Sequence, residues 1–78
     1  METQVMNVEK LVKMANQIGL FFDAMPDRPQ ALHDLVLHIR RSWDPGMRID
    51  LLSHVDETAG AGLSPVVREA LERHRSIL

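Results

Sequence analysis

Three short breaks built on proline or glycine divide the chain into four segments whose apolar residues have helical spacing. The breaks lie at residues 25–29, 44–45 and 58–65. Asp44-Pro45 and Ser64-Pro65 each pair a good N-cap residue with a proline, which is favoured in the first turn of a helix. The sequence therefore predicts an all-α fold: a small bundle of about four short helices joined by Pro/Gly-containing turns.

The predicted helices span residues 7–24, 28–43, 45–57 and 65–74, within one domain that covers residues 1–78. Asn7 and Asp27 are the candidate N-caps of the first two helices. We expect residues 1–6 and 75–78 to be frayed, because chain ends are poorly ordered unless they are tied down.

The length of the chain limits how stable such a bundle is. In a domain of 78 residues the gain from apolar burial barely exceeds the loss of chain entropy. The sequence has no cysteine, which excludes a disulfide, a thiolate metal site and the usual ligands of an iron–sulfur cluster. We therefore expect a partner protein to add stability, and a small bundle that is stable alone is the alternative.

The first predicted helix has more apolar surface than its own bundle requires. A stripe that includes Leu11, Ile18 and Phe22 follows one side, and Met14 and Phe21 widen it to about half the circumference. A helix on the surface of a bundle needs an apolar stripe of only about 100°. The excess predicts a second contact outside the bundle, although a helix surrounded by several others would show the same pattern.

Charge and hydropathy argue against several classes of function. The net charge is −2 with neutral histidines, which does not favour a phosphate backbone as ligand. No stretch approaches the ~20 apolar residues of a membrane span, and residues 1–6 lack the basic start of a secretory signal. We expect a cytoplasmic protein that binds neither nucleic acid nor membrane, and the absence of cysteine suits a reducing compartment.

The residue patterns that support catalysis or cofactor binding are missing from the sequence. The histidines His33, His38, His54 and His74 form no i, i+4 pair and no HExxH motif, so we assign no metal ligand. No glycine-rich phosphate loop follows a strand pattern, and no serine has the context of a nucleophile elbow. We also expect no room for a ligand pocket of about 300 Å³ in so small a bundle. The sequence therefore predicts no catalytic, cofactor-binding or metal-binding residue.

The turn at Trp43-Asp44-Pro45 has arginines on both sides, at Arg40, Arg41 and Arg48. Two helices joined by a tight turn suggest a helix-turn-helix, but the acidic net charge and the lack of a basic recognition helix argue against DNA binding. Trp and Arg are enriched at binding hot spots, so the turn is a candidate protein interface. In the alternative interpretation, Trp43 closes the core and the stem of Arg48 lies on apolar surface.

Three stretches of the sequence together are similar to one protein family. They are residues 11–26, with Met14-Ala15-Asn16-Gln17-Ile18 and Phe21-Phe22; residues 38–48, with Trp43-Asp44-Pro45 and Met47-Arg48; and residues 62–71, with Gly62-Leu63-Ser64-Pro65. In this order and at these spacings they resemble the delta subunit of NAD-dependent formate dehydrogenases. Ser42 and Gly46 depart from the family's pattern, which has an aromatic residue before the tryptophan and a basic residue after Pro45.

The resemblance implies a non-catalytic accessory subunit of a soluble, NAD-dependent, molybdenum-containing formate dehydrogenase. Its partners would be the other subunits of that enzyme, above all the large molybdenum subunit. Those subunits would carry the molybdenum–pterin centre, iron–sulfur clusters and FMN, and this chain would carry no cofactor. The expected role is to aid assembly, cofactor maturation or stability of the complex, as a permanent subunit or as a transient maturation factor. The alternative is a self-associating helical module, a homodimer unrelated to catalysis.

The candidate partner interface combines the widened stripe of the first helix with the arginine-flanked turn. Its residues are Met14, Phe21, Phe22, Trp43, Met47 and Arg48. Each of them also has an interpretation as a core residue. The burial of each side chain in the structure distinguishes the interface interpretation from the core interpretation.

Overall fold

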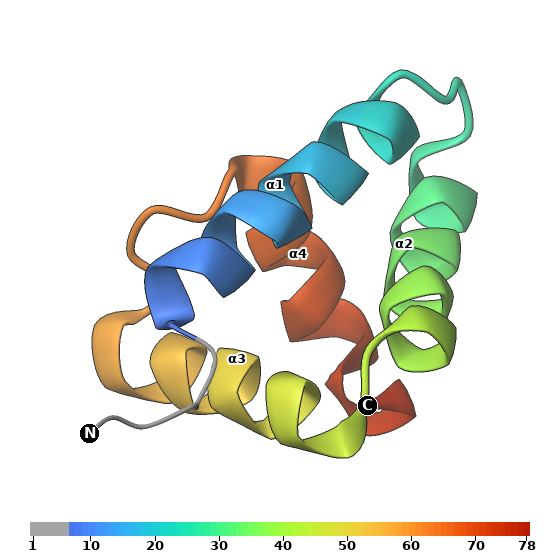
Figure 1. Ribbon diagram of the computed structural model, residues 1–78. Coiled ribbons are helices and arrows are strands. Elements are labelled where there is room, and N and C mark those ends of the chain that lie inside the picture. The colour runs from blue at the N-terminus through green and yellow to red at the C-terminus, as the bar shows by residue number, and fades with distance from the viewer. Residues whose placement is uncertain (1–6) are drawn as a thin grey trace.

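Four α-helices and one short 3-10 helix make up the described part of the chain. The computed structural model describes residues 7–78. Its elements are α1 (Val8–Asp23), α2 (Arg28–Ser42), α3 (Pro45–Thr58), α4 (Pro65–His74) and the 3-10 helix η1 (Arg75–Ile77) (Figure 1). No strand occurs in these residues. The predicted all-α bundle is confirmed, and each α-helix starts and ends within one residue of its predicted bounds.

Side-chain caps explain where the first three helices begin. In each case a side-chain oxygen of the N-cap residue accepts a hydrogen bond from an amide of the first turn, which has no partner within the helix. The bonds run from the Glu9 amide to Asn7 (2.7 Å), from the Gln30 amide to Asp27 (3.2 Å) and from the Met47 amide to Asp44 (3.0 Å).

The start of α4 differs from this pattern. Ser64 occupies the predicted N-cap position and Pro65 the first helical position, but the Ser64 hydroxyl is buried and makes no hydrogen bond. The backbone of Ser64 is instead fixed from α1, because Asn16 Oδ1 accepts a hydrogen bond from the Ser64 amide at 2.8 Å. A residue 48 positions away therefore fixes the backbone at the start of α4.

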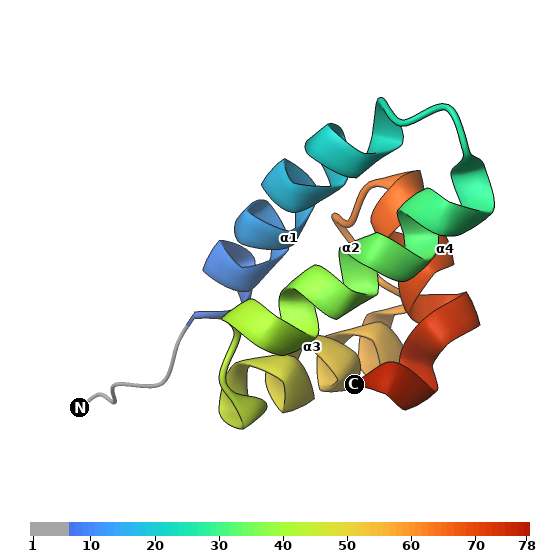
Figure 2. The ribbon, with the colours of Figure 1, turned by 90° about the vertical axis from the view of Figure 1, so that its right-hand side faces the viewer.

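The core forms where α2 packs against both α4 and α1, and α3 packs against α1 (Figures 1 and 2). Both views place α3 beside the N-terminal end of α1. In α3, only Leu51 is buried. The buried core residues are Leu11, Ala15, Leu32, Leu35, Val36, Ile39, Trp43, Leu51, Leu63, Val66, Val67, Ala70 and Leu71.

The C-terminal residues are packed, where the sequence predicted a frayed tail over residues 75–78. Ile77 and Leu78 are half-buried against the core. Arg40 Nη1 on α2 donates a hydrogen bond to the Ile77 carbonyl at 2.6 Å. The tail is ordered because two apolar side chains and hydrogen bonds at Ile77 and Arg75 tie it down, and sequence spacing does not reveal such bonds. Residues 1–6, also predicted to fray, lie outside the described residues.

Within residues 7–78, no helix has the length and apolar character needed to cross a membrane.

Candidate partner interface

Asn16 holds the loop between α3 and α4 against α1. Its Nδ2 donates a hydrogen bond to the Gly62 carbonyl at 3.0 Å, and its Oδ1 accepts the one from the Ser64 amide. Both bonds use backbone groups of the segment that leads into α4. Residues 11–26 and 62–71, two of the stretches that resemble the family, are therefore in contact. Both polar groups of the Asn16 amide are used in hydrogen bonds within the bundle.

Gly19 allows α1 to approach α4 closely. A Cβ atom built on Gly19 would lie 2.7 Å from Val67 Cγ2 and 3.0 Å from Val66 Cγ1. Real Cβ contacts are essentially never that short, so no larger residue fits without displacement. One side of α1, which carries Asn16 and Gly19, is thus occupied by α4 and the loop before it.

The turn after α2 serves the fold as well. Trp43 is 6% exposed and belongs to the core. Asp44 caps α3, and Pro45 occupies its first position. Gly46 is exposed, and a Cβ there would meet only the Asp44 carboxylate at 3.4 Å. The structure therefore favours the core interpretation of Trp43, and the departure from the family pattern at Gly46 lies at an open surface position.

Ion pairs tie the ends of the helices together. Arg28 at the start of α2 forms ion pairs with Asp23 of α1 and with Glu69 of α4. The hydrogen bonds that Arg28 donates to Asp23 and Glu69 raise the pKa of its guanidinium above the ordinary value. Both nitrogens of the Arg75 fork donate to Asp56 on α3 at 2.8 Å, and these hydrogen bonds lower the pKa of the Asp56 carboxyl.

The six predicted interface residues separate by burial. Phe21 is 69% exposed, with its ring edge-on to Phe22 at a centroid distance of 5.0 Å. Met14, Phe22 and Met47 are half-buried and pack on the core, and Trp43 is buried. Arg48 is half-buried, and its Nε atom is buried with no hydrogen-bond partner. Of the six, Phe21 alone is largely free to contact a partner, and the role of the set remains a prediction.

Two exposed apolar residues were missed by the sequence analysis. Leu20 is 73% exposed on α1, and Ile49 is 62% exposed on α3. Leu20 lies opposite the apolar stripe of α1 when successive residues are placed 100° apart, so a search for one stripe passes over it. The available signal was the run from Ile18 to Met25, in which Asp23 is the only polar side chain.

Glu9 and Asp23 are exposed at the margin of α1, and the other exposed residues of the helix form one continuous strip along it. They recur at intervals of three and four residues, which lie on one side of an α-helix. We call this set the outer strip of α1; its members are Lys10, Lys13, Gln17, Leu20, Phe21 and Ala24, the last being the C-cap. Its N-terminal end carries two lysines beside the exposed Glu9, and its C-terminal end is apolar.

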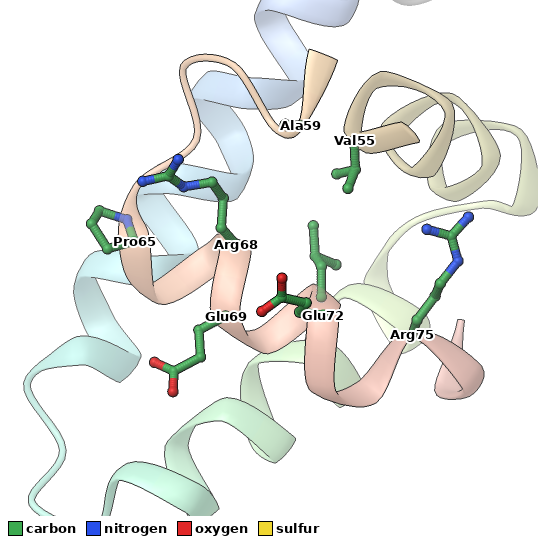
Figure 3. A pocket seen from close by; sticks show the side chains of 8 residues that line it. Val55, Ala59, Pro65, Arg68, Glu69, Glu72 and Arg75 are labelled. Atoms are coloured by element: carbon green, nitrogen blue, oxygen red, sulfur yellow. The ribbon is translucent and has the colours of Figure 1, made fainter. Parts of the chain in front are cut away.

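An open groove between α3 and α4 corrects the expectation that so small a bundle has no space for a ligand. The groove measures about 560 Å³. Val55 and Leu71 are among its apolar lining residues, and Arg68, Glu72 and Arg75 are among its charged ones (Figure 3). It exists because α3 and α4 make few contacts with each other, so their facing sides diverge. The groove is broadly open to solvent, unlike the enclosed pockets that bury most of a small ligand.

The histidines form one pair that spacing did not predict. His33 on α2 and His74 on α4 meet edge to face, with ring centroids 5.3 Å apart. Within residues 7–78, no group of three or more His, Asp or Glu residues is arranged to hold a metal ion.

Comparison with known protein families gives a match to the family of the NADH-dependent formate dehydrogenase delta subunit, FdsD, over residues 10–71. The chain belongs to this family. Comparison with curated proteins and with solved structures gives no match. The resemblance noted in the sequence is therefore confirmed, and it extends over most of the chain.

Much of the sequence pattern that identifies an FdsD protein here has a role in the fold. Asn16, Gly19 and Asp44 position helices, and Trp43 fills the core. Membership of the FdsD family therefore does not by itself indicate which residues contact other subunits. Exposure is the better guide, and among the apolar residues of this pattern it points to Phe21.

Proposed function

We propose that this chain is a non-catalytic subunit of a soluble, cytoplasmic, NAD-dependent molybdenum formate dehydrogenase. Its role would be to aid assembly, cofactor maturation or stability of the enzyme by docking on the large molybdenum subunit. The observation that carries the proposal is the FdsD family match over residues 10–71. The family's description names a delta subunit, which is a component of a larger assembly.

The exposed surface of the bundle supports a role in binding another protein. Leu20 and Phe21 lie side by side in sequence and are both about 70% exposed. Large apolar side chains that gather on a surface mark interaction sites more often than single ones do. A bundle of 78 residues is also marginally stable alone, so binding to a larger subunit would raise its apparent stability by mass action.

We assign the cofactors of the proposed enzyme to its other subunits. Iron–sulfur clusters are held by cysteine thiolates, and this chain has no cysteine. Its described residues do not assemble three metal-ligating side chains. The donor set of residues 7–78 therefore does not fit a cluster or a metal centre, and we derive no step of formate oxidation from it.

A transient maturation factor is the second candidate function. It shares the same partner but differs in stoichiometry, since a maturation factor leaves once the enzyme is complete. The marginal size of the bundle fits either role. The two are separated by asking whether purified, fully active enzyme still contains this chain.

The test is co-expression of the chain with the other formate dehydrogenase subunits, followed by purification through a tag on this chain. We expect the eluate to contain the large subunit in a 1:1 ratio, together with molybdenum and NAD-linked formate oxidation. If the chain elutes alone while active enzyme stays in the flow-through, the subunit role is refuted. Recovery with inactive, molybdenum-free enzyme only would favour the maturation factor.

A further inference from the structure

The outer strip of α1 is a free surface with two chemically different ends. Its C-terminal end carries the two most exposed large apolar side chains of the described residues, Leu20 and Phe21. Its N-terminal end carries Lys10 and Lys13, which are exposed. Figures 1 and 2 both place α1 along one edge of the bundle, and the strip residues are exposed within residues 7–78.

Residues 18–22 of α1 have no polar side chain on any side of the helix, which is unusual for a surface helix. Gly19 is buried against α4, and Phe22 is half-buried against the core near His38, on the side opposite Leu20. A helix that is apolar all round is normally buried all round. The bundle covers one side of this segment, so a second body is needed to cover the other.

Among the charges of α1 that form no ion pair within residues 7–78, two lysines outnumber one carboxylate, Glu9. Asp23, beside the apolar end, is already paired with Arg28. Glu9 lies in the first turn, where the free amides of the helix N-terminus favour a negative charge. Lys10 and Lys13 make no ion pair within residues 7–78. A complementary partner therefore supplies carboxylates near the lysines and an apolar surface near Leu20 and Phe21.

A second copy of this chain does not meet that requirement. Leu20 and Phe21 together expose roughly 250 Å² of side chain, well below the ~800 Å² per partner of a stable interface, so the contact has to extend along the strip. If two α1 helices paired in parallel, lysines would face lysines. If they paired antiparallel, the lysines of each copy would be desolvated against the apolar end of the other. In the parallel arrangement each copy brings only Glu9 against two lysines, and in the antiparallel one the nearby Asp23 is already paired with Arg28.

We propose that the outer strip of α1 docks an acidic and apolar segment of another formate dehydrogenase subunit. Its apolar anchor would cover Leu20 and Phe21, and its carboxylates would lie about 10–15 Å away, against Lys13 and Lys10, because these lysines precede Leu20 by seven and ten residues of helix. This inference rests on the proposed function and names the surface through which it acts.

The experiment measures binding of purified variants to the remaining formate dehydrogenase subunits, expressed without this chain. Leu20→Glu/Phe21→Glu removes the apolar end, and Lys10→Glu/Lys13→Glu reverses the charged end. Ile49→Glu is the matched control, because Ile49 is a similarly exposed apolar residue on α3. Circular dichroism verifies that each variant is folded, which we expect because every altered side chain is exposed.

We expect the Leu20→Glu/Phe21→Glu variant to bind at least tenfold more weakly and Ile49→Glu to bind like the unchanged chain. Raising the salt concentration should weaken binding of the unchanged chain and strengthen binding of Lys10→Glu/Lys13→Glu, because screening reduces an attraction in the first case and a repulsion in the second. Normal binding by Leu20→Glu/Phe21→Glu overturns the docking surface and leaves the proposed function intact. No binding by the unchanged chain overturns both. The unchanged chain could instead dimerise, with Leu20→Glu/Phe21→Glu alone abolishing the dimer while that variant still binds the other subunits normally. That result would assign the outer strip to contact with a second copy.

Discussion

Gly19→Ala should destabilise the bundle, although the same change in most helices is stabilising. The new methyl group would lie 2.7 Å from Val67 Cγ2 and 3.0 Å from Val66 Cγ1. Val67 is fully buried, and a β-branched side chain has few alternative rotamers, so it cannot turn away. The contact can relax only if α1 moves away from α4, which strains the Asn16 hydrogen bonds to the loop before α4.

The expected size of the effect follows from two opposing terms. Inserting a methyl group into a packed interface costs typically about 1–3 kcal/mol, and replacing glycine by alanine inside a helix recovers up to about 1 kcal/mol. The net loss of unfolding free energy should be up to about 2 kcal/mol. For a domain of this size a loss of about 2 kcal/mol lowers the melting temperature by roughly 8–16 °C.

Gly46→Ala supplies the control, because the chemical change is identical and the surroundings are open. A Cβ at Gly46 meets only the Asp44 carboxylate, at 3.4 Å, which is an ordinary contact. Gly46→Ala should leave stability unchanged or raise it by up to about 1 kcal/mol. Urea unfolding followed by circular dichroism measures both variants. A Gly19→Ala protein at least as stable as the unchanged chain would refute the close approach of α1 and α4.

Three further changes test other parts of the fold. Asn16→Ala leaves the Ser64 amide and the Gly62 carbonyl without their partners, so urea unfolding should show a loss of about 1–3 kcal/mol; no loss would mean that water replaces the side chain. Trp43→Ala removes a buried aromatic side chain at a cost of about 3–5 kcal/mol. That loss is enough to leave so small a domain largely unfolded, as measured by circular dichroism. A cooperative, native-like unfolding transition would contradict the placement of Trp43 in the core. Folding lowers the pKa of Asp56, so the Arg75 pair stabilises the fold above the unfolded-state pKa of about 4 and that contribution disappears as pH falls through the lowered value. Asp56→Asn should therefore be less stable than the unchanged chain at pH 7 and equally stable in strong acid, and a difference that persists in acid would assign the effect to something other than this ion pair.

The helices could be predicted from the sequence because their boundaries are set locally. Asp27 and Asp44 cap the helices that follow them through bonds to amides three residues away. Pro45 and Pro65 each occupy the first position of a helix, where a missing amide has no consequence. These helix boundaries depend only on neighbouring residues, so short sequence motifs are enough to predict them.

The contacts that fasten the helices to one another could not be predicted in the same way. Asn16 and Ser64 are 48 residues apart, and Arg40 and Ile77 are 37 apart. No spacing rule connects such pairs, because their distance depends on how the helices cross. The ordered tail and the bare Ser64 hydroxyl are both consequences of these long-range contacts, and both differ from what local rules predict.

The candidate interface was predictable only in part, for a related reason. The excess apolar width of α1 predicted a second contact, and Phe21 is indeed exposed. Periodicity alone could not separate Phe21 from Met14 and Phe22, because three residues close to one side of a helix differ in burial according to the neighbouring helix. It also passed over Leu20, which lies outside any single stripe.

The two sides of α1 have separable roles, so the hypothesis of a docking subunit can be tested by changing stability and binding independently. Asn16 and Gly19 hold the loop and α4, so changes there alter stability first and binding only as a consequence. Leu20 and Phe21 face solvent, so changes there should leave the free energy of unfolding nearly constant and act on binding alone. If Leu20→Glu/Phe21→Glu instead unfolded the isolated chain, these two side chains would make contacts that stabilise the fold, contrary to their exposure. The argument for a partner on that side of α1 would then fail.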